Sequence, residues 1–116
     1  MRLEVDEPES RVVAATDQDG TIIGLATAGA TRDDDAPTAW ELYSINVVAE
    51  RQGSGVADDL IEVTAGDRDT TVWVLDHNAR AQSFYRRHGF VLQGATTLDE
   101  VTGGRELRMV RALLER

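Results

Sequence analysis

A short glycine-containing turn between two apolar segments constrains this chain more than any other feature. Residues 40–60 have the sequence WELYSINVVAERQGSGVADDL, which begins with residues typical of a buried strand and turns at Gly53 and Gly55. From Val56 onward, apolar residues recur at helical spacing as far as Gly66. The segment therefore predicts a strand, a turn and a helix. The unpaired N–H groups and the positive dipole end of such a helix form a pocket for phosphate oxygens.

The residues of this turn do not match two common phosphate-binding loops. A mononucleotide P-loop requires a lysine after its second glycine, and all 12 basic residues of this chain are arginine. A dinucleotide fingerprint requires a third glycine at the position of Asp58. The pattern that does match is Q-x-x-G-x-A, formed by Gln52, Gly55 and Ala57.

A second motif follows the next predicted strand, at residues 71–75. Residues 77–90 have the sequence HNARAQSFYRRHGF. Asn78 is suited to cap a helix that starts at Ala79, and Gly89 is suited to end it. Together the two motifs resemble the GNAT superfamily of acetyl-CoA-dependent N-acetyltransferases, in which Q/R-x-x-G-x-G/A is followed by N-x-x-A/S-x-x-F/L-Y-x-x-x-G-F. The residues that match the second motif in order and spacing are Asn78, Ala81, Phe84, Tyr85, Gly89 and Phe90.

The resemblance implies an α/β (α+β) fold in a single domain that covers residues 1–116. Its mixed, mostly antiparallel sheet has a splayed central pair of parallel strands and flanking helices. The strand–helix–strand order around the glycine turn independently favours a parallel pair. Gly24 is expected to mark a bulge or a close backbone approach, and residues 31–38 a polar, mobile loop. The other strands are predicted at residues 1–5, 11–16, 21–30, 90–97 and 105–113.

The same resemblance implies that acetyl-CoA binds as a co-substrate. The first parallel strand would hold the pantetheine amides, the glycine turn the pyrophosphate, and the Asn78 side chain the pantetheine arm. The backbone N–H of Val47 would polarise the thioester oxygen. The predicted cofactor-binding residues are Ile45, Asn46, Val47, Gln52, Gly53, Ser54, Gly55, Val56, Ala57 and Asn78. Candidates for the 3′-phosphate of CoA are Arg51, Arg80, Arg86 and Arg87, although most helix arginines are merely solvated.

Two residues are candidates for the chemistry. In the family, the Tyr85 hydroxyl would protonate the leaving thiolate, which suits a phenol with an ordinary pKa of about 10. The alternative for Tyr85 is a core aromatic residue beside Phe84. Glu41 would accept the proton of the acceptor ammonium group, and its alternative is an exposed strand carboxylate. Tyr43, on the same strand face, would line the acceptor pocket.

Composition limits the reaction and its partners. The chain has no cysteine to form an acyl-enzyme, so the amine is expected to attack the thioester directly in a ternary complex. The net charge of −9 argues against nucleic acid or an anionic membrane surface and favours a cationic amine, either small or on a protein or peptide. His77 and His88 lack a carboxylate at ligand spacing, so no metal is predicted. Residues 1–10 contain no apolar region of the kind that a signal peptide has, so a cytoplasmic protein is expected, and arginine in place of every lysine suggests a bacterial source.

The chain departs from the family in two places. Most members have two helices between the first two strands, whereas here only about five residues separate them, so these N-terminal helices are reduced or absent. The acceptor groove is then open to a protein or peptide, or a second subunit of a homodimer closes it. Asp58 and Asp59 follow the turn, where they would repel a diphosphate if they faced it. The alternative functions are a non-catalytic acyl-CoA sensing module, a subunit of a larger acetyltransferase, and a domain whose glycine turn is purely structural.

Overall fold

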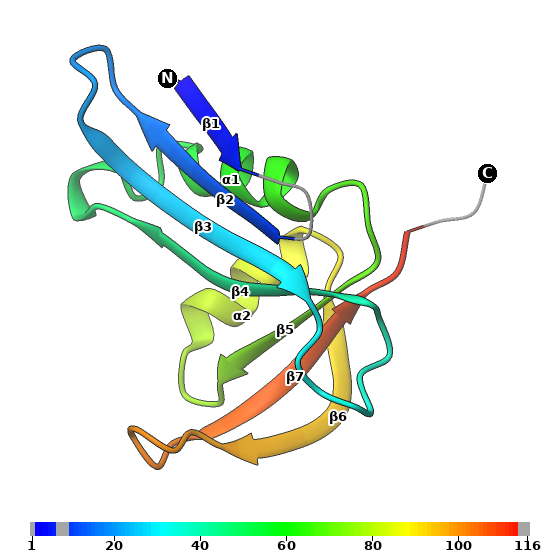
Figure 1. The fold of residues 1–116 in the computed structure, drawn as a ribbon. Coiled ribbons are helices and arrows are strands. Elements are labelled where there is room, and N and C mark those ends of the chain that lie inside the picture. The colour runs from blue at the N-terminus through cyan, green and yellow to red at the C-terminus, as the bar shows by residue number, and fades with distance from the viewer. Residues whose placement is uncertain (1, 7–9, 114–116) are drawn as a thin grey trace.

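The two strands on either side of the glycine turn lie at the centre of the sheet. The computed structural model describes residues 2–6 and 10–113, in which seven strands form one sheet of order β1-β2-β3-β4-β5-β7-β6 (Figure 1). The strands are β1 (Arg2–Asp6), β2 (Ser10–Thr16), β3 (Ile22–Ala30), β4 (Trp40–Val47), β5 (Thr70–Leu75), β6 (Val91–Leu98) and β7 (Arg105–Arg111). The helices are α1 (Val56–Ala65), α2 (Ala79–Arg87) and the 3-10 helix η1 (Ala49–Arg51). This mixed sheet with its flanking helices confirms the predicted fold class.

β4 and β5 are parallel neighbours that soon separate. Three residue pairs join them, the last of which is Leu42 opposite Val72. Beyond this pair β4 continues to Val47 against β3 alone, and β5 continues to Leu75 against β7 alone. The predicted splay is therefore present. It leaves one backbone edge of β4 without a strand partner.

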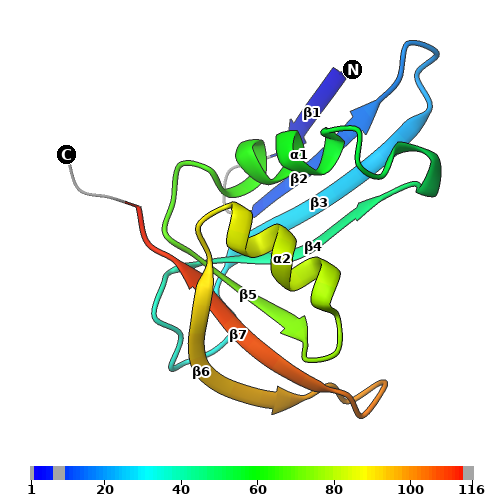
Figure 2. The same cartoon turned by 180° about the vertical axis from the view of Figure 1, so that it is seen from behind.

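Both α-helices cover the same face of the sheet, behind it in Figure 1 and in front of it in Figure 2. α1 joins two apolar clusters on this face. Val56 and Leu60 pack under β2 and β3, and Ile61 and Ala65 pack in a second cluster that also contains Tyr85 of α2. Full burial of a large aliphatic side chain contributes roughly 2 kcal/mol. α1 therefore ties the two halves of the splayed sheet together.

β3 approaches α1 closely at Gly24. A Cβ atom at this position would lie 2.8 Å from Leu60 Cδ1 and 3.1 Å from Val56 Cγ1. Any larger residue would force the side chains of Leu60 and Val56 to shift. The pairing of β2 with β3 is also irregular here, with a register shift between Ala15 and Thr16. The close approach predicted for Gly24 is confirmed.

The other face of the sheet has no helix in the described part of the chain. Only residues 7–9 lie between β1 and β2, which is too short a connection for the two helices that most family members have there. No helix within residues 2–6 or 10–113 is long and apolar enough to span a membrane. We call this second face the open face.

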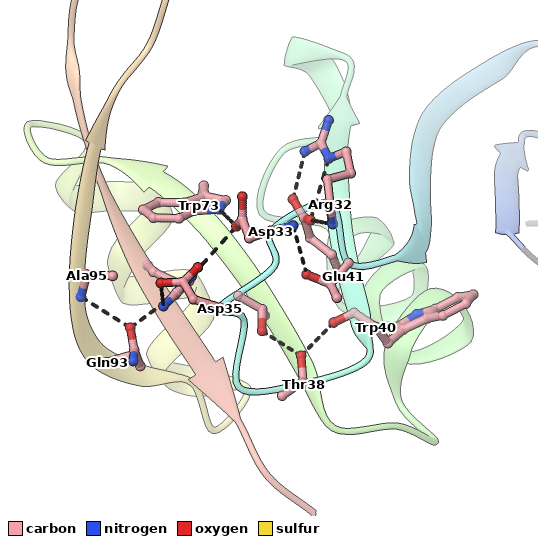
Figure 3. Close-up of polar contacts among 12 residues, drawn as sticks. Arg32, Asp33, Asp35, Thr38, Trp40, Glu41, Trp73, Gln93 and Ala95 are labelled. Atoms are coloured by element: carbon pink, nitrogen blue, oxygen red, sulfur yellow. Dashed lines mark hydrogen bonds and ion pairs between the residues drawn. The ribbon is translucent and has the colours of Figure 1, made fainter.

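The acidic segment between β3 and β4 folds over the open face (Figure 3). Asp33 accepts a hydrogen bond from Trp73 Nε1 at 2.7 Å, and Asp35 forms a 3.0 Å ion pair with Arg108, whose side chain is only 2% exposed. Gln93 accepts a hydrogen bond from Arg108 Nε at 3.0 Å. The sequence predicts a mobile, solvated connector here. The side chains instead fasten the segment to β5 and β7, which no local pattern in the sequence indicates.

Candidate active site

A cleft lies between the end of β4, the glycine turn and α2. Because residues of both α1 and α2 line it, the cleft lies on the helix-covered side of the sheet. Most of the predicted cofactor-binding residues line this cleft, namely Ile45, Asn46, Val47, Gln52, Gly53, Gly55, Ala57 and Asn78. Two of the predicted residues do not. The Val56 side chain is 5% exposed and packs in the core, and the Ser54 hydroxyl donates a hydrogen bond to the carbonyl of Arg51.

The turn leaves several backbone amides free at one end of the cleft. The amide of Gln52 donates to the carbonyl of Ala49 at 3.3 Å, and that of Ser54 donates to the carbonyl of Arg51 at 3.2 Å. Gly53 and Gly55 have φ angles of 80° and 96°, a conformation that favours glycine. Five amides have no hydrogen-bond acceptor among the described residues, those of Gly53, Gly55, Val56, Ala57 and Asp58. Free amides that precede a helix form an anion site.

Side chains of the cleft fix its two rims. Asn78 Oδ1 accepts a hydrogen bond from the amide of Ala81 at 3.0 Å, which confirms the predicted helix cap. Gln52 links the glycine turn to α2, because its Oε1 accepts from Arg80 at 2.7 Å. Its Nε2 donates to the carbonyl of Val47 at 3.3 Å. The turn, β4 and α2 are therefore held together by polar contacts around the cleft.

Asp58 faces the cleft, and its carboxylate is bonded to Arg87 at the end of α2 and to His88, the residue that caps this helix. His88 Nε2 lies 2.7 Å from its Oδ1, and Arg87 Nη2 lies 2.8 Å from the same atom. The hydrogen bond with His88 and the nearby Arg87 hold the pKa of Asp58 below its usual range. Of the arginines predicted near the 3′-phosphate, Arg51, Arg80 and Arg87 line the cleft and Arg86 does not.

Tyr85 lies at the α2 end of the cleft and is also part of the core. Its side chain is 7% exposed, and its ring makes edge contacts with Phe84 and Phe90 at centroid distances of 5.4 and 5.6 Å. Burial raises the pKa of Tyr85 to about 12. Its hydroxyl has no hydrogen-bond partner in the described residues. The core packing weighed for Tyr85 is therefore present, and its role as a general acid stays a prediction.

Glu41 does not line the cleft. Its side chain is 1% exposed and lies on the open face, where all its hydrogen bonds come from Arg32 (Figure 3). The Arg32 amide donates to Oε1 at 3.0 Å and its Nη2 donates to Oε2 at 2.7 Å. The guanidinium also lies 4.4 Å above the ring of Tyr43, whose hydroxyl donates to the carbonyl of Ala30. Glu41 is therefore a buried carboxylate paired with Arg32 and not an exposed one, and its role as the base stays a prediction.

The order of strands, the splay and the cleft identify a known domain. The family model described as acetyltransferase (GNAT) domain matches residues 8–92. This chain belongs to the GNAT acetyltransferases. No curated protein sequence matches this GNAT domain.

Solved acetyltransferase structures resemble this GNAT domain. Nourseothricin acetyltransferase has a TM-score of 0.73 at 26% identity, over 91% of this chain and 66% of its own. A Corynebacterium glutamicum protein described as histone acetyltransferase HPA2 and related acetyltransferase has a TM-score of 0.71 at 24% identity, over 93% and 67%. The NatC complex bound to Gag peptide and CoA has a TM-score of 0.71 at 15% identity, over 90% and 71%. The GNAT domain thus spans about two thirds of the first two relatives, and the last two show likeness of fold alone.

The sequence motifs of this GNAT domain do not show the contact between Arg32 and Glu41. Arg32 donates hydrogen bonds to both carboxylate oxygens of Glu41, the predicted base. In the sequence, the acidic residues after Arg32 do not distinguish it from a solvated arginine. The only available signal was its position nine residues before Glu41, across a turn between neighbouring strands. Within residues 2–6 and 10–113, no group of three or more His, Cys, Asp or Glu side chains is placed to hold a metal ion.

Proposed function

We propose that this chain transfers the acetyl group of acetyl-CoA to a primary amine by direct attack in a ternary complex. One observation carries the proposal: a single cleft joins the free amides of the glycine turn to the Tyr85 hydroxyl. Diphosphate oxygens would bind the amides of Gly53, Gly55 and Ala57, next to Arg51 and Arg87. The pantetheine arm would lie along the unpaired edge of β4.

Tyr85 would act as the general acid. A thiolate leaving group needs a proton donor that is still protonated at neutral pH, and the raised pKa of Tyr85 meets that need. The backbone N–H of Val47 would polarise the thioester oxygen. The ammonium proton needs an acceptor, which is a carboxylate directly or through water. Glu41 is poorly placed to take it, because its side chain is 1% exposed and both of its oxygens accept hydrogen bonds from Arg32.

We further propose that the acceptor is a cationic amine. The net charge of −9 favours the approach of cations over the whole surface. Nourseothricin acetyltransferase, at 26% identity, makes nourseothricin a first acceptor to test. Spermidine and a basic peptide with a free N-terminus represent small and peptide amines. The absence of helices on the open face suits a larger acceptor, or closure of the groove by a second copy of the chain.

Two measurements test the proposal. CoA should raise the melting temperature of the protein, because only the folded state offers the free amides. Acetyl-CoA with one of the three amines should release thiol above background, and release should fall in Tyr85→Phe. No stabilisation by CoA at millimolar concentration would contradict both binding and catalysis.

A second candidate function is acyl-CoA sensing without turnover, favoured by the three-residue connection between β1 and β2. A sensing module would be stabilised by CoA and release no thiol with any amine. The same pair of measurements therefore separates the two functions.

A further inference from the structure

Glu106 on β7 is a partly buried residue of the open face. No described side chain forms a hydrogen bond or an ion pair with its carboxylate. Along β7, Leu107 and Met109 pack with the helix-side core. Strand alternation therefore places Glu106 and Arg108 on the opposite face, where Arg108 meets the acidic segment between β3 and β4. The Glu106 side chain makes no hydrogen bond or ion pair within residues 2–6 and 10–113, although its backbone pairs with β5 and β6. Its carboxylate lone pairs are open to a ligand.

Glu41 lies on the same face as Glu106. Trp40 and Leu42 belong to the helix-side core, so the side chain between them points to the open face. The charges of the two carboxylates interact, since the negative charge of Glu41 raises the pKa of Glu106. Glu106 pairs in register with Leu75 at the end of β5, beyond the point at which β4 and β5 separate. It therefore lies on the open face one strand away from the gap, with β5 between them, at the level where β4 and β5 have already separated.

The acceptor amine must reach the thioester from the open face. The cleft on the helix-covered side would hold the cofactor with its sulfur towards Tyr85. Because α1, α2 and the cofactor would fill the helix-covered side, the open way to the carbonyl carbon for an amine is through the gap from the open face. Of the carboxylates there, Glu41 is bonded to Arg32, and Asp33 and Asp35 are bonded to Trp73 and Arg108.

On the proposed function, we infer that Glu106 is the proton acceptor of the reaction. The acceptor ammonium gives one proton to the Glu106 carboxylate, and the neutral nitrogen forms the C–N bond. As the C–S bond breaks, Tyr85 protonates the sulfur, and the nitrogen loses its second proton to solvent. Tyr85 and Glu106 then exchange protons with solvent, so one proton is released in each turnover.

The surroundings of Glu106 suit this role. Partial burial raises its pKa first, and the charges of Asp99 and Glu41 raise it further, while the charge of Arg32 lowers it. A carboxylate whose pKa lies above its usual range of about 4.3 is a stronger base. The wild-type kcat/KM for the acceptor should therefore fall at acidic pH, and the apparent pKa of this acidic limb should lie above the usual pKa range of a glutamate.

Glu106→Gln tests the inference, with Glu100→Gln as a matched control that removes an exposed carboxylate from the β6–β7 connection. We expect thiol release with nourseothricin, spermidine or the basic peptide to fall about 100-fold at neutral pH in Glu106→Gln, and its acidic limb to disappear. Glu106→Asp should recover part of the rate. The KM for acetyl-CoA and the stabilisation by CoA should stay within twofold of the wild type, and Glu100→Gln should match the wild type throughout.

Three results would overturn the inference. If Glu106→Gln keeps the acidic limb while CoA still binds and the wild type turns over, Glu106 is not the acceptor although the proposed function stands. If Glu41→Gln removes the limb and Glu106→Gln does not, the proton goes to Glu41. If CoA neither stabilises the protein nor supports thiol release from any of the three amines, the proposed function fails as well.

Discussion

At the residue scale, Tyr85 combines a place in the core with a hydroxyl at the cleft. Tyr85→Phe removes only that hydroxyl, which has no partner among the described residues, so we expect the melting temperature to change little. Loss of a general acid should lower kcat about 100-fold without raising the KM for acetyl-CoA. Steady-state thiol release and thermal unfolding, measured on the same preparation, check this. A kcat within threefold of the wild type would show that another group protonates sulfur.

The raised pKa of Tyr85 also predicts how stability depends on pH. In the unfolded chain the phenol ionises near its ordinary pKa of about 10, whereas in the folded protein it stays protonated up to about 12. The unfolded state therefore gains stability as the pH rises between these values, and folding loses up to about 3 kcal/mol. Denaturant unfolding across this range should show a smaller loss in Tyr85→Phe. Equal losses in both proteins would contradict the burial of a protonated phenol.

Gly55 shows how a backbone conformation and a binding site depend on one residue. Gly55→Ala places a side chain at a φ of 96°, which should cost about 1 kcal/mol of stability and shift the turn, and its Cβ would take up open space at a residue that lines the cleft. We expect the Kd for CoA to rise about tenfold. Gly20→Ala is the matched control, because Gly20 has a φ of 83° and also has no atom within 4 Å of its Cβ position. Calorimetric titration of CoA should separate the two variants, and equal Kd values would argue against phosphate binding at the turn.

For the strands, helices and turns, the sequence predicted those features that depend on contacts between residues close in the chain. The turn at Gly53 and Gly55 and the Asn78 cap follow from the conformations and hydrogen bonds of residues close in sequence. The contacts across the open face do not, because Asp35 and its partner Arg108 are separated by 73 positions. For the same reason, the motif around Glu41 gave no sign that Arg32 would occupy it.

The acidic segment between β3 and β4 can be released through its buried partner. Arg108→Met removes the cation that Asp35 contacts, but that carboxylate is 78% exposed and can be hydrated again. We therefore expect a loss of about 1–2 kcal/mol, below the 3–5 kcal/mol typical when a fully buried charge loses its partner. Amide hydrogen exchange over residues 31–38 should accelerate.

Arg105→Met is the matched control for Arg108→Met, because Arg105 is an exposed arginine on the same strand. It should leave both stability and exchange near the wild-type values. If exchange over residues 31–38 is the same in the two variants, the ion pair does not fasten the segment.

At the scale of the whole molecule, the net charge of −9 should appear in the kinetics. Raising the salt concentration from about 0.02 to about 0.3 M shortens the screening length and weakens the attraction of a distant cation. The KM for spermidine should rise several-fold, whereas that for hydroxylamine, which is neutral at pH 7.5, should stay nearly constant. Parallel salt titrations with the two acceptors make this comparison, and identical slopes would contradict steering by the surface charge.

The short pairing of β4 with β5 has a mechanical consequence. Three residue pairs join the half that contains β1 to β4 to the half that contains β5, β7 and β6. The strands within each half are paired over more residues, so the sheet should deform most easily between β4 and β5. A ligand that contacts both the glycine turn and α2 would restrict the motion of the two halves of the sheet relative to each other. Amide protons of β5, which lie far from any phosphate, should then exchange more slowly when the ligand is bound.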